Sequence, residues 1–141
     1  MLTKFEILKE RCKEEELELW ELSIIDEMEN SGKTEDEIFD RLQRTLDVMK
    51  KSAQAALEEP VTSVTGMTGG NAKTMNDYFL GGQSILGETA AKAMAMALST
   101  SEVNAAMGRI VAAPTAGASG ILPATLMIMY HKYGFDDRKL M

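Results

Sequence analysis

The segment Pro114-Thr-Ala-Gly-Ala-Ser-Gly120 combines two hydroxyl side chains with glycines that let other groups approach the backbone closely. The apolar run 124–130 follows it and predicts a helix whose first turn starts near Ser119. A helix N-terminus carries free N–H groups and a partial positive charge, so it attracts carboxylates and phosphates. We expect the hydroxyls of Thr115 and Ser119 and the backbone N–H groups of Gly117 to Gly120 to bind such an anion. Taken alone, the segment is also compatible with a plain turn between two helices.

A second candidate loop is Thr65-Gly-Met-Thr-Gly-Gly-Asn-Ala-Lys-Thr74. Thr68 and Asn71 are placed to orient polar groups, and Lys73 is able to pair with an anion. The loop is not a P-loop, because Ala72 precedes the lysine where glycine is required and no strand is predicted upstream. The alternative is a flexible surface connection.

The elements that position these loops are predicted to be helices, and we assign the chain to the all-α class as an irregular helical domain with glycine-rich loops. A helix is expected over 3–29, with a Thr3/Glu6 capping pattern, a break or solvated face at Glu14–Glu16, and an end at Asn30-Ser-Gly32. Thr34 with Glu37 repeats the capping pattern. An apolar stripe then runs towards Pro60 through Ile38, Leu42, Leu46, Met49, Ala53 and Leu57.

Beyond Pro60 glycines, threonines and serines dominate, and only a short helical piece at Met75–Leu80 is predicted before Gly87. Gly87–Leu98 is predicted to be a buried helix. Ser99-Thr-Ser101 is predicted to cap a further helix over Glu102–Ala112. The last helix is expected over about 120–133, ending at Gly134. We therefore divide the chain into an acidic helical region, 1–59, and a glycine-rich-loop and helix region, 60–141.

Charge is distributed unevenly along the chain. Residues 1–59 hold nine Lys/Arg against seventeen Asp/Glu, whereas 60–141 hold six against five. An acidic surface repels nucleic acid and anionic lipid, so neither is an expected partner. No apolar run reaches the length of a membrane span and no signal peptide is recognised. The single cysteine, Cys12, is typical of a reducing compartment, and we expect a cytoplasmic protein.

Three segments together resemble the iron–sulfur-dependent L-serine dehydratases, in the alpha-chain or catalytic-domain part of that family. They are Thr65–Ala72, Ser101–Gly108 and Ala112–Pro123, in the family's order and spacing. The resemblance implies deamination of L-serine to pyruvate and ammonia with a [4Fe–4S] cluster. It also favours the ligand-binding interpretation of residues 115–120 over a plain turn, and it adds Asn104 of the Ser-Glu-Val-Asn motif as a substrate-binding candidate.

For two further residues, Arg109 and His131, a chemical role is weighed against a structural one. Arg109 is able to clamp a carboxylate through two hydrogen bonds, and a surface or capping role is equally compatible with its position. His131 is the only histidine, and it lies near the end of a predicted helix, where the helix dipole favours its protonated form. We expect it to be positional rather than catalytic, so no catalytic residue is assigned within the chain.

The family holds its cluster with several cysteines, and Cys12 alone cannot supply such a set. The resemblance therefore implies that the cluster ligands lie beyond Met141, and that the base lies in a beta chain or another domain. We expect this chain to be a part of the dehydratase that is inactive by itself and that self-associates through its Met/Ala-rich helices. The alternative hypothesis is a non-catalytic helical module for assembly. A pyridoxal-dependent enzyme is disfavoured, because no lysine is well placed for a Schiff base.

Overall fold

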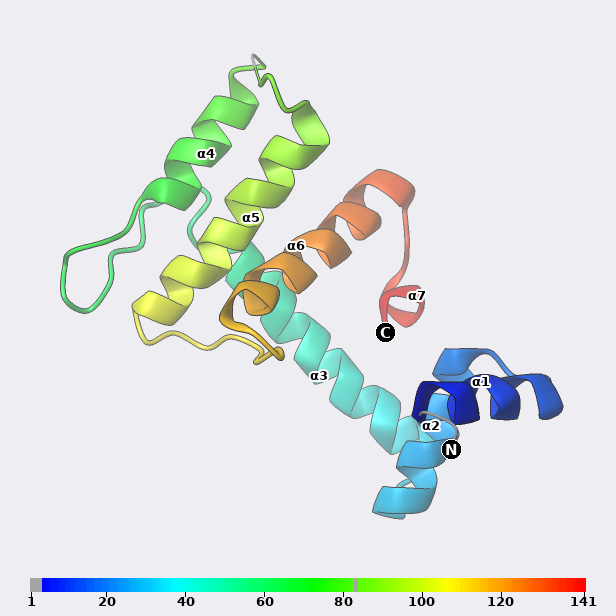
Figure 1. The fold of residues 1–141 in the computed structure, drawn as a ribbon. Coiled ribbons are helices and arrows are strands. Elements are labelled where there is room, and N and C mark those ends of the chain that lie inside the picture. Colours follow the sequence, from blue (N-terminus) through cyan, green and yellow to red (C-terminus); the bar gives the residue numbers. More distant parts are fainter. Residues whose placement is uncertain (1–3, 83) are drawn as a thin grey trace. The chain divides into compact units, whose positions relative to one another are not determined.

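The computed structural model describes residues 4–82 and 84–141, and within these ranges the regular structure is entirely helical (Figure 1). The predicted all-α class is therefore confirmed. A single isolated bridge pairs Thr62 with Gly69. The chain forms two compact units, residues 1–42 and 43–141, which are described separately. The predicted division at residue 59 stays a prediction.

The first unit contains α1 (Lys4–Glu14), α2 (Leu19–Ser31) and the beginning of α3 (Glu35–Gln54). The chain leaves α1 through Glu16, which has a left-handed φ of 54°, so the predicted break in the acidic run is confirmed. Gly32 ends α2 with a φ of 67°, and its N–H donates to the carbonyl of Met28. Thr3, the predicted cap of the first helix, lies outside the described residues.

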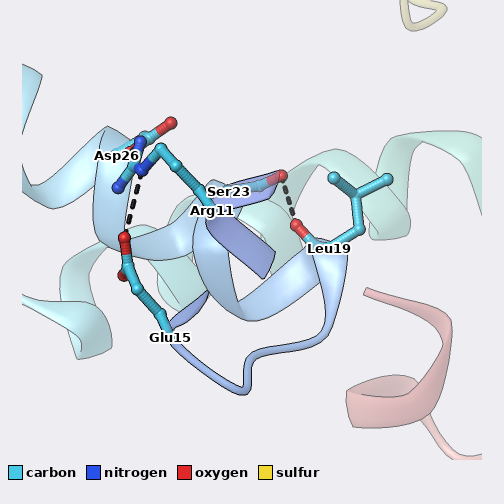
Figure 2. Close-up of polar contacts among 5 residues, drawn as sticks. All are labelled: Arg11, Glu15, Leu19, Ser23 and Asp26. Carbon is cyan, nitrogen blue, oxygen red and sulfur yellow. Dashed lines mark hydrogen bonds and ion pairs between the residues drawn. The ribbon is translucent and has the colours of Figure 1, made fainter. Parts of the chain in front are cut away.

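Polar contacts join α1 to α2 (Figure 2). The guanidinium of Arg11 donates to Asp26 of α2 at 2.8 Å and to Glu15 at 3.2 Å. These two hydrogen bonds raise the pKa of Arg11 above its ordinary value. The hydroxyl of Ser23 donates to the carbonyl of Leu19 within α2. Leu22 is the fully buried side chain of this helix pair.

The beginning of α3 follows the sequence prediction closely. The Thr34 N–H donates to Glu37 Oε2 at 2.9 Å, and the Glu37 N–H donates to Thr34 Oγ1 at 3.3 Å, which forms the predicted capping box. The stripe also buries its side chains as expected, since Ile38, Leu46, Met49 and Ala53 are all buried.

The end of α3 comes earlier than predicted because a side chain from another helix interrupts its hydrogen bonds. Ser99 Oγ donates to the carbonyl of Ser52 at 2.8 Å and accepts from the N–H of Ala56 at 3.0 Å. In a continuing helix those two backbone groups would bond to each other. The Ser99 hydroxyl takes both partners, so α3 ends at Gln54 rather than near Pro60.

The second unit contains the rest of α3 together with α4 (Asn71–Leu80), α5 (Glu88–Ala105), α6 (Ala116–Tyr133) and α7 (Asp137–Leu140). Helix α5 packs against both α4 and α6 (Figure 1). A core cluster is formed by Ala53, Met96, Ala124 and Met127. On α7, Asp137 accepts hydrogen bonds from Lys50 and Gln43 of α3, and these contacts lower the pKa of its carboxyl.

Helix α5 differs from the prediction because it runs without interruption through Ser99-Thr-Ser101. The expected cap there is wrong, since the hydroxyls of Thr100 and Ser101 donate back to carbonyls four residues earlier in the helix. The expected helix over Glu102–Ala112 is wrong too, because α5 ends at Ala105. The turn that closes it places Met107 in the left-handed region, with a φ of 61° and a side chain that is 84% exposed.

The two neighbouring helices begin earlier than predicted. Helix α4 starts at Asn71 rather than near Met75, and α6 starts at Ala116 rather than near Ser119. Thr115 caps α6 by accepting the N–H of Ala118 at 3.1 Å. Helix α6 ends at Gly134, which lies in the left-handed region with a φ of 65°, as predicted.

Two glycines of α6 provide a matched test of the helix packing. A Cβ on Gly120 would lie 2.9 Å from the carbonyl oxygen of Ala97 in α5, whereas a Cβ on Gly117 would meet open space. Replacing Gly120 by alanine should therefore destabilise the chain by about 1–3 kcal/mol. Replacing Gly117 should stabilise it by up to about 1 kcal/mol, because alanine favours the helix. Urea unfolding of both variants measures the difference, and equal stabilisation by both would contradict this close α5–α6 contact.

Candidate functional site

The three segments singled out in the sequence meet around the C-terminal end of α5. The loop over residues 61–70, called loop 61–70 below, is tied to α5 by a hydrogen bond from the Val64 N–H to the carbonyl of Ala105, 3.1 Å long. The segment 106–115 leaves this end of α5 and leads into α6 (Figure 1). Helix α6 in turn contacts α5 where Gly120 meets Ala97. The fold therefore attaches both loops to the C-terminal half of the same helix, α5.

In the segment 115–120 the predicted ligands separate into exposed and internal groups. Thr115 and Gly117 are exposed at the first turn of α6. Ser119 is buried, and its hydroxyl accepts from the N–H of Ala113 at 3.0 Å and donates to the carbonyl of Thr115. Gly120 is buried at the contact with α5. Ser119 and Gly120 thus build the turn, while Thr115 and Gly117 face outward.

The exposed first turn of α6 has the chemistry of an anion site. The first N–H groups of a helix have no partner within the helix, and here they belong to Ala116 and Gly117. The Thr115 oxygen accepts from Ala118, which leaves its proton able to donate to a further acceptor. Because Gly117 has no side chain, nothing covers its amide from the Cβ direction. We call Thr115, Ala116 and Gly117 the candidate anion site.

Loop 61–70 is held by backbone contacts. Ser63 donates its N–H to the carbonyl of Thr68 and accepts the Thr68 N–H on its hydroxyl, at 2.8 and 3.2 Å. The Thr68 side chain itself is exposed. Gly69, at a φ of 146°, lies so close to the Val61 backbone that a Cβ would overlap it. This residue must therefore be glycine for the loop to close.

The remaining candidates lie on the surface of α4, of α5 and of the segment after α5. The side chain of Asn71, at the start of α4, and that of Asn104, in the last turn of α5, are exposed, and Arg109 is exposed in the segment after α5. Lys73 forms an ion pair with Asp77 one turn later in α4, at 2.6 Å, and this hydrogen bond raises the pKa of Lys73. Any anion that approaches Lys73 would compete with the Asp77 carboxylate.

His131 lies at the other end of α6, away from its first turn. Burial lowers the pKa of its imidazole, and the positive charges of Lys92 and Lys50 lower it further. This is opposite to the sequence prediction that the helix dipole favours the protonated form. Burial and, after it, the nearby lysines outweigh the dipole, because both disfavour the charged imidazolium.

Sequence reasoning did not single out Glu102. This side chain is only 7% exposed, and its Oε1 accepts the backbone N–H groups of Asn71 and Ala72 at 2.6 and 3.3 Å. Its other oxygen, Oε2, is buried and has no hydrogen-bond partner among the described residues. The available signal was an acidic residue in an otherwise uncharged stretch of α5, because a buried carboxylate requires partners.

The residues present do not fit an iron–sulfur cluster. Such clusters are held by a set of thiolates, and the chain has only Cys12, which lies half-buried in α1. No group of three or more His, Cys, Asp or Glu side chains suited to a metal occurs in the part of the chain that the structure describes.

No described helix is both long and apolar enough to cross a membrane.

Comparison with known proteins agrees with these motifs. Residues 14–141 match the family described as serine dehydratase alpha chain, and the chain belongs to this family. It is 48% identical over 125 residues to the L-serine dehydratase, alpha chain, of Peptoniphilus asaccharolyticus. These residues make up 89% of this chain and 43% of that protein. It is 42% identical to the probable L-serine dehydratase, alpha chain, of Bacillus subtilis (strain 168), covering 89% of this chain and 41% of that one.

The chain thus spans less than half the length of the curated relatives that it matches. No solved structure shows a significant match to it. The resemblance drawn from the sequence motifs is confirmed at the level of the family.

The single histidine allows a direct test of the electrostatics at the end of α6. We expect its pKa to lie below the ordinary value of about 6.5 and to rise when Lys92 is replaced by glutamine. Because the folded pKa is lowered, the stability contributed by neutral His131 is present above about pH 6.5 and is lost as the pH falls through the folded pKa. An NMR titration of the imidazole measures this pKa, with Lys33→Gln in the first unit as the control. A wild-type pKa above 6.5 would contradict the prediction.

Proposed function

We propose that this chain forms part of an L-serine dehydratase, which deaminates L-serine to pyruvate and ammonia, and that the candidate anion site binds the carboxylate of the substrate. Membership of the family supports the reaction, as does the similarity to two proteins that are named as an L-serine dehydratase and a probable L-serine dehydratase, alpha chain. The observation that carries the binding role is the exposed first turn of α6, where Thr115 and two helix amides converge.

The proposed contacts follow from the chemistry of this turn. A carboxylate placed there accepts the N–H groups of Ala116 and Gly117 and the proton of the Thr115 hydroxyl. Hydrogen bonds to a charged group contribute about 1.5–3 kcal/mol each, and the helix dipole adds about 0.3–1 kcal/mol. The internal hydrogen bonds of Ser119 keep the turn in this conformation before substrate arrives, which limits the entropy lost on binding.

The role of these residues is then to bind and orient the substrate. The [4Fe–4S] cluster that the family resemblance implies takes its cysteine ligands from outside these 141 residues in this proposal. The base that removes the α-proton likewise belongs to a beta chain or to another domain. No chemical step is therefore assigned to a side chain of this segment, and we expect it to be inactive alone.

A hybrid enzyme tests the proposal. The matching segment of the Peptoniphilus alpha chain is replaced by this chain, the hybrid is produced anaerobically with its partner chain, and pyruvate formation from L-serine is measured. Thr115→Ala should raise KM for L-serine about ten- to hundredfold, as expected when one charge-assisted hydrogen bond is lost. Thr115→Ser keeps the hydroxyl and should leave KM close to that of the parent hybrid.

Thr34→Ala is the matched control for lost stability. It removes the side-chain cap of α3 in the first unit, which costs about 1 kcal/mol, as the loss of the Thr115 cap does. Its KM should be unchanged. An active hybrid in which Thr115→Ala leaves KM unchanged would overturn the carboxylate site, and a hybrid that forms no pyruvate would overturn the proposed reaction.

A second candidate function, assembly, is favoured by apolar side chains on the first unit. Four large ones are exposed on α1 and α2: Phe5, Ile7, Leu19 and Trp20. The side chain of Trp20 is 57% exposed, and a contiguous patch of exposed apolar side chains is typical of an interaction surface.

Self-association of the 141-residue chain should therefore weaken when Trp20 is replaced by glutamate. Sedimentation velocity at several concentrations measures it, and Leu80→Glu, at an exposed apolar position of the second unit, is the control. A wild-type chain that remains a monomer over the whole concentration range would contradict the assembly role.

A further inference from the structure

Helices α4 and α6, which follow the two candidate loops, differ in what their first backbone N–H groups contact. The first turn of α6 is exposed, whereas the first two amides of α4 donate to the Glu102 carboxylate of α5. A carboxylate is the kind of group that a helix N-terminus attracts. In α4 the chain supplies that anion itself from 31 residues away, so this N-terminus is closed to a ligand.

Local sequence cannot perform this capping. The residue before α4 is Gly70, which has no side chain and a φ of 79°. Gly69 cannot be replaced, because its Cβ would overlap the Val61 backbone. The start of α4 therefore depends on Glu102, and the same contact brings the end of loop 61–70 onto α5.

Glu102 also lies beside the contact between α5 and α6. Its neighbour Ser101 places its hydroxyl 3.5 Å from the position of a Cβ on Gly120, and Ala97 contacts the same glycine. The last turns of α5 thus hold α6 through one face and the start of α4 through Glu102. Loop 61–70 and the candidate anion site are fixed with respect to each other through this part of α5.

Capping alone does not account for the burial of the side chain. The Glu102 side chain is more than nine-tenths buried, and Oε2 has no partner among the described residues. Burying an unpaired carboxylate oxygen is unfavourable, whereas a serine or aspartate at an N-cap is solvated on its outer side. The buried position nevertheless restricts the carboxylate to one place, which is what positioning a loop requires.

On the basis of the proposed function, we infer that Glu102 is a positioning residue for the dehydratase reaction. Its carboxylate fixes loop 61–70 and the first turn of α4 against α5, at a set position relative to the substrate carboxylate bound at α6. Thr115 binds the substrate in this arrangement, and Glu102 fixes the position of loop 61–70 with its polar groups on α5. Loss of Glu102 should therefore act on kcat, whereas loss of Thr115 acts on KM.

The first measurement uses the 141-residue chain and does not depend on activity. Amide hydrogen exchange is followed by NMR for wild type and Glu102→Ala. We expect faster exchange at Asn71 and Ala72, which lose their acceptor, and also at Val64, whose bond to Ala105 holds the loop. Unchanged protection of Val64 in the variant would overturn the inference, because the loop would then keep its place without Glu102.

The second measurement uses the hybrid enzyme and separates positioning from general loss of stability. Glu102→Ala should lower kcat about ten- to hundredfold, since a small misplacement of a substrate-orienting group has an effect of that size. Glu102→Gln keeps one acceptor oxygen and should recover much of kcat. Ser99→Ala is the matched control, because it removes another buried hydrogen-bonding group of α5 that contacts α3 and not α4.

The possible outcomes distinguish this inference from the proposed function. An equal loss of kcat in Ser99→Ala and Glu102→Ala would overturn the inference and leave the Thr115 result standing. A hybrid without activity would count against the proposed function. The exchange rate of the Val64 amide in the 141-residue chain would still show whether Glu102 holds loop 61–70 in place.

Discussion

Small side chains on α5 allow its neighbours to approach closely, and the rest of the second unit depends on this packing. Ala91, Ala95 and Ser99 are fully buried on this helix, and Gly120 of α6 meets its backbone. At such short separations a hydroxyl reaches the backbone of a neighbouring helix, which is how Ser99 ends α3. Larger side chains would separate the helices and leave those backbone groups without partners.

Close packing also explains why Ser99 and Glu102 of α5 have structural roles while Thr115, at the start of α6, remains exposed. Ser99 and Glu102 lie inside the unit and satisfy backbone groups of α3 and α4. Thr115 lies where no other described helix covers the chain, so its hydroxyl satisfies only its own helix. Unpaired helix amides are therefore bonded internally by Glu102 at α4 and left exposed, as a candidate anion site, at α6.

The parts of the fold that could be predicted from sequence depend on local interactions. The capping box of Thr34 with Glu37 and the end of α6 at Gly134 involve residues no more than five positions apart. The C-terminal end of α3 and the start of α4 could not be predicted, because Ser99 and Glu102 act from 43 and about 30 residues away. For the candidate site, the sequence singled out residues 115–120 as one segment. It could not tell the exposed Thr115 from the buried Ser119, because that difference arises from the contact with α5.

The methionines on the turns around α5 have a chemical consequence of their own. Met67 on loop 61–70 and Met107 after α5 are each 84% exposed, whereas Met49, Met96 and Met127 are buried in the core. Thioether sulfurs are oxidised to sulfoxides according to their accessibility. A mild oxidant therefore marks these two loops first and spares the core. The ratio of sulfoxide at exposed and buried methionines provides an internal footprint of whether another polypeptide covers this end of the unit.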